Sequence, residues 1–261
     1  MPEVSEHTDT LGDQPLFWRS ADGGEPPVLY LHGVPTSSDD WVPFLARTGG
    51  IAPDMPGFGR SGKRGDLDFT MAGYDRFVDA FLAHVEVDAV RLVVHDWGVV
   101  GLLWAQRFPE RVERLVVINA VPLLPGYRWH PFARLWRTPG VGEVAIGLAT
   151  AWAARRVGVP PRIVDEAWPH FDQGTQRAIL RLYRSSPEDA LAGAGLDLAR
   201  IDCPALVAWG DRDRYIPSRF ADAYASALGG DTEIVHLDDA GHWPWHDRPD
   251  VIDRITAFLD A

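Results

Sequence analysis

Three short apolar runs constrain the fold more than any other feature of the sequence. They span Val28 to Leu31, Leu92 to Val94 and Leu115 to Ile118, and within each run the neighbours of an apolar residue are apolar too. A strand with this pattern is buried on both faces, as the strands of a parallel sheet are. Helical patterns lie between the runs, and strand alternating with helix is typical of an α/β fold.

The middle of the sequence shows a different pattern of secondary structure. Helical patterns replace strand patterns there, until strand character returns at Ala205 to Trp209 and at Glu233 to Leu237. We therefore expect one α/β core, formed by residues 1–121 and 204–261, and a helical insertion at residues 122–203.

The chain carries a strongly negative charge. Its 261 residues include 25 Lys and Arg against 37 Asp and Glu, which gives a formal net charge of −12. An excess of carboxylates repels phosphate backbones and anionic lipid, so we expect neither nucleic acid nor a membrane surface as a partner. Apolar residues make up 46% of the chain, enough to bury a core. A neutral small molecule remains as the expected ligand.

The sequence shows no mark of export. Cys203 is the only cysteine, so no internal disulfide can form. Met1 to Asp13 is polar and acidic, unlike a secretory signal peptide. The nearest approach to a membrane segment is Val144 to Ala154, where we expect a buried or ligand-facing helix, because a span needs about 20 apolar residues. A cytoplasmic location is therefore the default prediction.

Asp96 lies where an apolar strand meets a helix. In Val94 to Gly98, which reads Val-His-Asp-Trp-Gly, it takes the central place of the nucleophile elbow known from G-x-S-x-G enzymes. Serine at this place suits acyl transfer. A carboxylate suits attack on an sp3 carbon, where it displaces a leaving group and forms an alkyl ester with the enzyme. The alternative role for Asp96 is that of a helix N-cap.

Five motifs along the chain resemble those of the α/β-hydrolase superfamily, in the same order. The elbow His-Asp-Trp-Gly is similar to that of one branch, which holds the epoxide hydrolases and haloalkane dehalogenases. The resemblance implies an α/β-hydrolase fold, a mostly parallel sheet flanked by helices with a helical cap inserted after the sixth strand. Val94 departs from the pattern, because the family usually has Gly there. The motifs are His32 to Pro35, Asp54 to Ser61, the elbow, Gly210 to Asp213 with Pro217, and Gly241 to Trp243.

An ester on Asp96 must be hydrolysed by a water that a base activates, and neutral imidazole is the usual base near pH 7. The resemblance puts the catalytic histidine at His242. A carboxylate is expected to fix its tautomer, and the family pattern favours Asp213 over Asp211, which suits a turn. Some dehalogenases carry this acid after the preceding strand, but residues 118–121 contain no carboxylate.

The same resemblance implies an oxyanion hole. The backbone N–H groups of Val34 and Trp97 would hold the Asp96 oxygen that turns negative when water attacks. In epoxide hydrolases of this branch, two cap tyrosines donate to the leaving oxygen. Tyr183 and Tyr127 are the candidates for these donors.

Dehalogenases bind the halide differently. They use the indole N–H of the Trp after the nucleophile, here Trp97, together with a second donor. That donor is often an Asn at the position of Val34, which has no side-chain donor, or a cap Trp. The run Pro35 to Ser38 is more like that of a dehalogenase. The cap supplies four tryptophans: Trp129, Trp136, Trp152 and Trp168.

These features together predict a hydrolase that forms an alkyl ester on Asp96. Our main prediction is epoxide hydrolysis to a vicinal diol, and haloalkane dehalogenation is the alternative. Further hypotheses are another hydrolase or lyase reaction, or a non-catalytic small-molecule binding protein on the same scaffold. We expect a neutral apolar substrate and water as partners. We expect no metal or organic cofactor, because the nine His are scattered and no Gly-rich phosphate loop carries a Lys.

Overall fold

The computed structural model describes residues 2–156 and 159–261 of the chain. Within them the strands form one eight-stranded sheet, in the order β1-β2-β4-β3-β5-β6-β7-β8. The β1/β2 and β2/β4 pairs are antiparallel and the other pairs are parallel, so the predicted α/β class is confirmed. The strands are β1 (Ser5–Leu11), β2 (Gln14–Ala21), β3 (Val28–Leu31), β4 (Gly50–Pro53), β5 (Val90–His95), β6 (Val112–Ile118), β7 (Ala205–Gly210) and β8 (Thr232–Leu237).

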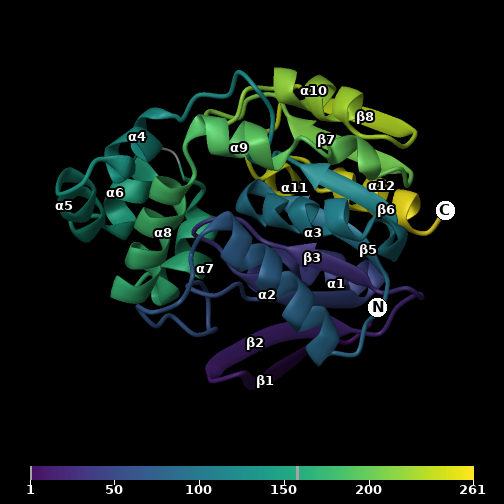
Figure 1. The fold of residues 1–261 in the computed structure, drawn as a ribbon, viewed down its shortest axis with the longest axis horizontal. Helices are drawn as coiled ribbons and strands as arrows, with labels where there is room; N and C mark the ends of the chain where they lie inside the picture. The colour runs from purple at the N-terminus through teal and green to yellow at the C-terminus, as the bar shows by residue number, and fades with distance from the viewer. Residues whose placement is uncertain (1, 157–158) are drawn as a thin grey trace.

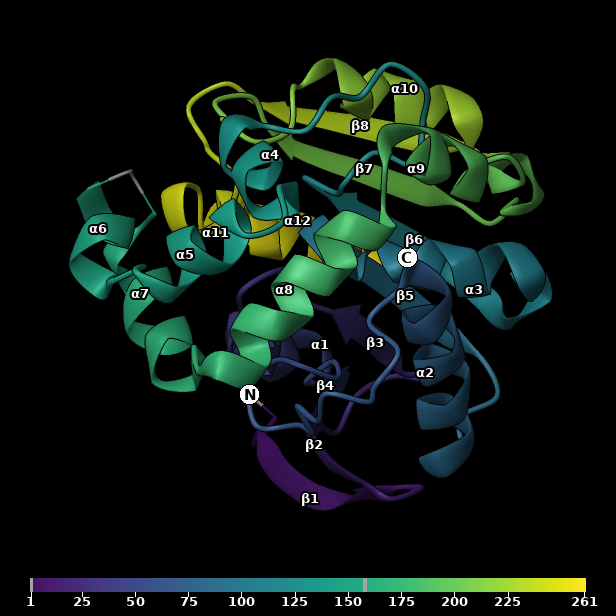
Figure 2. The ribbon, with the colours of Figure 1, turned by 60° about the vertical axis from the view of Figure 1, so that its left-hand side comes forward.

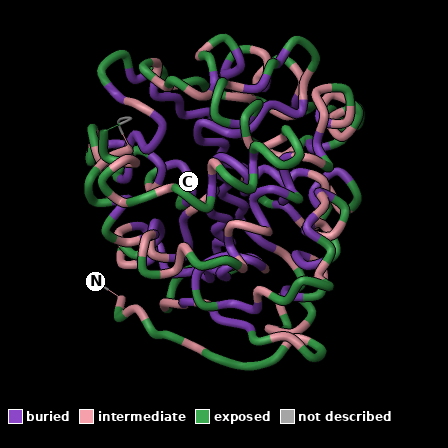
Figure 3. The backbone as a smooth tube through the Cα atoms, turned by 90° about the vertical axis from the view of Figure 1, so that its left-hand side faces the viewer, coloured by how far each residue is buried: buried purple, intermediate pink, exposed green. Residues whose placement is uncertain are grey.

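The three apolar runs of the sequence are β3, β5 and β6, which lie side by side in the middle of the sheet. Alternate residues of these strands enter two different cores, Leu29 and Leu92 on one face and Val28 and Val93 on the other. Both faces are covered, which is why each of these strands contains a continuous apolar run. Figure 3 shows the buried backbone gathered in the middle of the molecule.

Helices cover the two faces of the sheet. They are α1 (Val42–Thr48), α2 (Met71–His84), α3 (Gly101–Arg107), α10 (Arg219–Ala227), α11 (Pro244–Asp247) and α12 (Asp250–Leu259). The helices α2, α3 and α10 contribute to the core that contains Leu29, while α1, α11 and α12 contribute to the core that contains Val28. In Figure 1, α2 and α3 lie in front of the sheet.

The segment between β6 and β7 adds further helices. These are α4 (Pro131–Arg137), α5 (Val141–Gly147), α6 (Ala151–Arg156), α7 (Pro161–Ala167), α8 (Gln173–Ser185) and α9 (Glu188–Ala194). Helices α4 to α8 gather on one side of the molecule, on the left in Figure 1; in Figure 2, α5 to α7 are on the left and α8 crosses the middle. The fold class with a helical insertion after the sixth strand is thereby confirmed. The boundaries of the cap at residues 122 and 203 stay a prediction.

The apolar stretch Val144 to Ala154 does not form the single buried or ligand-facing helix that we expected. It is divided between α5 and α6, because Thr150 begins a new helix by accepting the N–H of Ala153 at 3.1 Å. Val144 and Trp152 are 61% and 67% exposed. The small residues of the stretch face the cavity described below. Among the described residues, no helix is both long enough and apolar enough to cross a membrane.

Candidate active site

Asp96 occupies a sharp turn between a strand and a helix. β5 ends at His95, and the 3-10 turn η2 (Asp96–Val100) leads into α3. The φ angle of Asp96 is 48°, in a left-handed region that L residues enter at a cost of roughly 1–3 kcal/mol. The turn brings the carboxylate to the carboxyl edge of the parallel strands, where α/β sheets bind their ligands.

Two glycines make room for this turn. A Cβ added to Gly33 would lie 2.6 Å from Asp96 Cβ, so only glycine lets the loop after β3 approach the Asp96 carboxylate this closely. Gly101 accommodates Val94, which stands where the family usually has Gly. A Cβ at Gly101 would lie 3.3 Å from Val94 Cγ1 and 2.5 Å from Leu31 Cδ1. The first residue of α3 therefore leaves the space that the branched side chain in β5 needs.

Backbone donors surround the Asp96 carboxylate. The N–H of Val34 donates to Oδ2 at 2.9 Å, and the N–H of Trp97 adds to the stabilisation of the charged carboxylate. Burial raises the pKa of Asp96, and His242 with these N–H groups offsets only part of that rise, so the pKa stays above its ordinary value. The structure thus brings both predicted donors to Asp96. Stabilising an oxyanion is their proposed role.

His242 lies between two carboxylates. Its Nδ1 is 2.6 Å from Asp213 Oδ2, and its Nε2 is 3.7 Å from Asp96 Oδ1. An Nδ1–H that donates to Asp213 leaves the Nε2 lone pair facing Asp96, as a general base requires. Burial alone would lower the pKa of His242, but the charges of Asp213 and Asp96 outweigh burial and hold this pKa above its ordinary value.

Three hydrogen bonds besides that of His242 fix Asp213. Its Oδ1 accepts two backbone N–H groups of the following turn, at 2.7 and 3.1 Å, and its Oδ2 accepts Asn119 Nδ2 at 2.8 Å. The competing candidate, Asp211, pairs instead with the half-exposed His236 at 2.7 Å. The geometry therefore joins Asp213 and not Asp211 to the histidine.

Asn119 is a site residue that the sequence reasoning missed. It directly follows β6, and its side chain also exchanges hydrogen bonds with the backbone of Gly210 at 2.8 and 3.2 Å. Residues 118–121 contain no carboxylate, but the side-chain amide of Asn119 positions Asp213, the carboxylate that follows the next strand of the sheet. The place of Asn119 after a buried parallel strand was the signal that could have found it.

A cavity of about 330 Å³ lies over Asp96 and His242, and cap residues form much of its wall. The wall is mainly apolar, which suits a neutral organic molecule. The side chains on it that can donate hydrogen bonds come from Tyr127, Trp129, His130, Trp136, Thr150, Trp168, Tyr183, Tyr215, His242 and Trp243.

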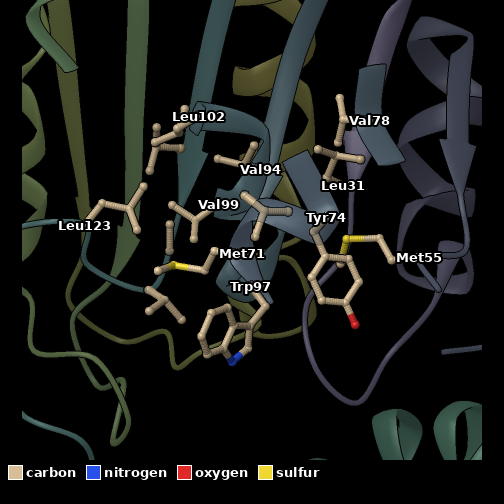
Figure 4. Close-up of a cluster of buried hydrophobic side chains, with 14 of the residues drawn as sticks. Leu31, Met55, Met71, Tyr74, Val78, Val94, Trp97, Val99, Leu102 and Leu123 are labelled. Carbon is tan, nitrogen blue, oxygen red and sulfur yellow. The ribbon is translucent and has the colours of Figure 1, made fainter. Parts of the chain in front are cut away.

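The indole of Trp97 lies against this wall. It stacks on Trp129 with ring centroids 5.5 Å apart and meets Tyr183 edge-on at 5.2 Å. In Figure 4 its nitrogen is on the side of the ring turned away from the labelled aliphatic side chains. Nε1 makes no hydrogen bond of normal geometry to any described residue. Other buried tryptophans share this state, so it is the place of Trp97, packed behind two residues of the cavity wall and directly after Asp96, that makes its N–H a candidate donor for a ligand.

The two predicted cap tyrosines both reach the cavity. Burial raises the pKa of Tyr127 and of Tyr183, and the charge of Asp96 raises both further, so both hydroxyls keep their protons. The Tyr127 hydroxyl has no partner among the described residues. Of the cap tryptophans, Trp129 donates its N–H to the Ser186 carbonyl at 3.0 Å, and the exposed Trp152 does not line the cavity.

Comparison with known proteins agrees with this geometry. The family model of the alpha/beta hydrolase fold matches residues 26–139. A haloalkane dehalogenase of Mesorhizobium japonicum is 30% identical over 280 residues, which cover 94% of this chain and 87% of that protein. The chain belongs to the α/β-hydrolase superfamily, in its dehalogenase branch.

Other members of the dehalogenase branch are similar too. Haloalkane dehalogenase 1 of Mycobacterium tuberculosis is 34% identical over 209 residues, which cover 72% of this chain and 68% of that protein. The crystal structure of haloalkane dehalogenase DbeA from Bradyrhizobium elkani matches with a TM-score of 0.85 at 25% identity, covering 99% of this chain and 98% of that one. The protein is thus an enzyme of the α/β-hydrolase type. These matches favour the dehalogenase alternative over epoxide hydrolysis.

Proposed function

We propose that this α/β hydrolase is a haloalkane dehalogenase, which replaces a halogen on an sp3 carbon by a hydroxyl group. The observation that carries the proposal is the place of Trp97, which follows the nucleophile directly and whose buried N–H makes no hydrogen bond of normal geometry to any described residue. A large soft halide needs only weak donors of this kind, whereas the alkoxide of an opened epoxide needs a proton. Similarity to dehalogenases over nearly the whole chain supports the same reaction.

The first step is a displacement at carbon. A carboxylate oxygen of Asp96 forms a bond to the carbon, and the carbon–halogen bond breaks, with its electron pair leaving on the halide. Trp97 Nε1–H donates to the departing halide, and a cap hydroxyl, that of Tyr127 or Tyr183, serves as the second donor. The apolar cavity wall holds the alkyl chain in line for this attack.

The second step hydrolyses the ester. His242 Nε2 takes a proton from water, and the water oxygen attacks the carboxyl carbon of Asp96. The N–H groups of Val34 and Trp97 hold the oxygen that becomes negative. The acyl–oxygen bond then breaks, His242 returns its proton to the alcohol, and Asp96 releases a proton to solvent. One turnover therefore yields an alcohol, a halide ion and a proton.

Epoxide hydrolysis is the second candidate, because Tyr127 and Tyr183 present hydroxyls to the same cavity. A paired assay separates the two reactions: 1-bromohexane with bromide as the readout, and styrene oxide with diol as the readout. We expect bromide release and little diol. Diol without bromide would replace our proposal by the epoxide reaction, and ligand binding with neither product would favour a binding protein.

The variant Trp97→Phe is expected to release bromide about 100-fold more slowly, the usual cost of losing one donor to a developing charge. The matched control is Trp129→Phe, which removes an indole that stacks on Trp97 but whose N–H already binds a backbone carbonyl. Its loss of rate is expected to be clearly smaller. Bromide release measured by ion chromatography in both variants checks this, and equal losses would remove Trp97 from the leaving-group site.

Ester hydrolysis is expected to rise with pH, with a midpoint set by the pKa of His242. His242 accepts a proton only in its neutral form, and Asp213, which stays charged in the ester, raises its pKa. We expect Asp213→Asn to move the midpoint to lower pH. The pH profile of kcat, measured where hydrolysis limits turnover, checks both statements. A rate of hydrolysis that does not change with pH, or a midpoint that does not move in the variant, would contradict this account.

A further inference from the structure

His130 lies on the wall of the cavity and takes no part in the proposed reaction. Tyr215 lies between it and His242, with ring centroids 5.1 Å from each imidazole. The imidazole of His130 also forms the N-cap of a helix, because its Nδ1 accepts the N–H of Ala133 at 3.3 Å, at the start of α4. This cap accounts for one ring nitrogen and leaves the other unassigned.

The hydrogen bond from the Ala133 N–H fixes the tautomer of His130. Burial lowers the pKa of this imidazole to about 4, and the charges of His242 and Arg134 lower it further, while Asp213 opposes them. The ring is therefore neutral at pH 7 and carries one proton. Because Nδ1 accepts a hydrogen bond, that proton is on Nε2. Nε2–H makes no hydrogen bond to any residue that the structure describes.

We propose that Nε2–H of His130 forms a polar subsite for the substrate, which binds an ether or carbonyl oxygen a few bonds from the reacting carbon. A donor on the wall of the cavity loses the hydrogen bond to water when an alkyl chain covers it, and regains a partner when the bound molecule offers an oxygen acceptor. The rest of the nearby wall is largely apolar, so this donor discriminates between otherwise equal chains. The inference that the substrate carries a halogen rests on the proposed function. The inference that the cavity has a subsite for an oxygen rests on His130 alone.

Capping alone is the competing explanation for His130, and two substitutions separate the roles. Asn and Ser both cap helices well, so His130→Asn and His130→Ser preserve the start of α4. Neither side chain extends to the position of Nε2, so both remove the donor. His170→Asn is the matched control, because His170 also lies in the helical segment between β6 and β7 but does not line the cavity. Thermal unfolding confirms that each variant is folded.

The test measures binding without turnover. Tryptophan fluorescence, to which the cavity residues Trp129 and Trp136 contribute, reports the Kd of three alcohols of equal chain length. These are hexan-1-ol, 3-ethoxypropan-1-ol and 6-hydroxyhexan-3-one. We expect the Kd of each oxygen-bearing ligand, divided by that of hexan-1-ol, to rise about tenfold in both His130 variants. Comparing variants cancels the difference in ligand hydration.

The outcomes separate the subsite from the reaction. Ratios that stay within about twofold of wild type in both variants, for both oxygen-bearing ligands, would overturn the subsite. So would an equal change in the His170→Asn control. Bromide release from 1-bromohexane and 1-bromo-3-ethoxypropane tests the proposed function separately. Shifted ratios without bromide release would reject dehalogenation and retain the subsite.

Discussion

Asp96→Asn is expected to lower bromide release by at least about 10⁴-fold while the protein stays folded. An amide has no anionic oxygen with which to attack carbon, so the first bond never forms. The fold survives because Asn tolerates the left-handed φ of 48° as Asp does, and because its Oδ1 can still accept the Val34 N–H. Bromide release and thermal unfolding measure the two halves of this expectation.

The matched control is Asp211→Asn, the same change at a carboxylate that pairs with His236 outside the cavity. It is expected to keep wild-type turnover. A single turnover of excess wild-type enzyme in ¹⁸O-water adds a second readout, because the new oxygen enters Asp96 and the first alcohol carries none. Turnover by Asp96→Asn, or label in the first alcohol, would reject the covalent mechanism.

The variant His242→Gln is expected to stop the reaction halfway. Displacement by the Asp96 carboxylate needs no base, so one equivalent of bromide is released, but no base then activates water. Steady-state turnover falls roughly 10³-fold, within the range for loss of a general base. Intact-protein mass spectrometry is expected to find the mass of one alkyl group added, with the ester on Asp96.

The corresponding control is His236→Gln, since His236 is half-exposed and bonds to Asp211 rather than to the site. It is expected to show neither added mass nor a loss of rate. An unmodified His242→Gln protein that still releases bromide continuously would mean that another group serves as the base. The same protein without any bromide burst would place His242 in the displacement step instead.

The strands show which parts of the fold the sequence could reveal. β3, β5 and β6 were predictable because both of their faces are buried, which gives each of them a continuous apolar run. β1 (Ser5–Leu11) was not, because it is an exposed edge strand without apolar alternation. β4 (Gly50–Pro53) has only four residues, begins with Gly and ends with Pro, and its extended state comes from pairing with β2 and β3.

The residues of the site also differ in whether the sequence could reveal them. Asp96, Asp213 and His242 lie in motifs at the ends of strands, and the sheet brings the ends of parallel strands to one edge, so their assembly could be expected from local signals. Asn119 also follows a buried strand but lies in none of the motifs, and His130 lies neither in a motif nor at the end of a strand. Their roles depend on groups that lie across the site from distant parts of the chain, and no periodicity or spacing encodes those contacts. The single helix expected at Val144 to Ala154 failed for a local reason, the new start at Thr150.

The helices between β6 and β7 have a consequence for how such enzymes diversify. The core holds Asp96, Asp213 and His242, the proposed nucleophile, acid and base, while Tyr127, His130 and Tyr183 belong to the continuous segment between β6 and β7. Substitutions confined to that segment can therefore change the wall of the cavity without changing the residues that make and break bonds in the proposed reaction. A graft of that segment into a relative would carry the substrate range with it, and the recipient would keep its own pH profile.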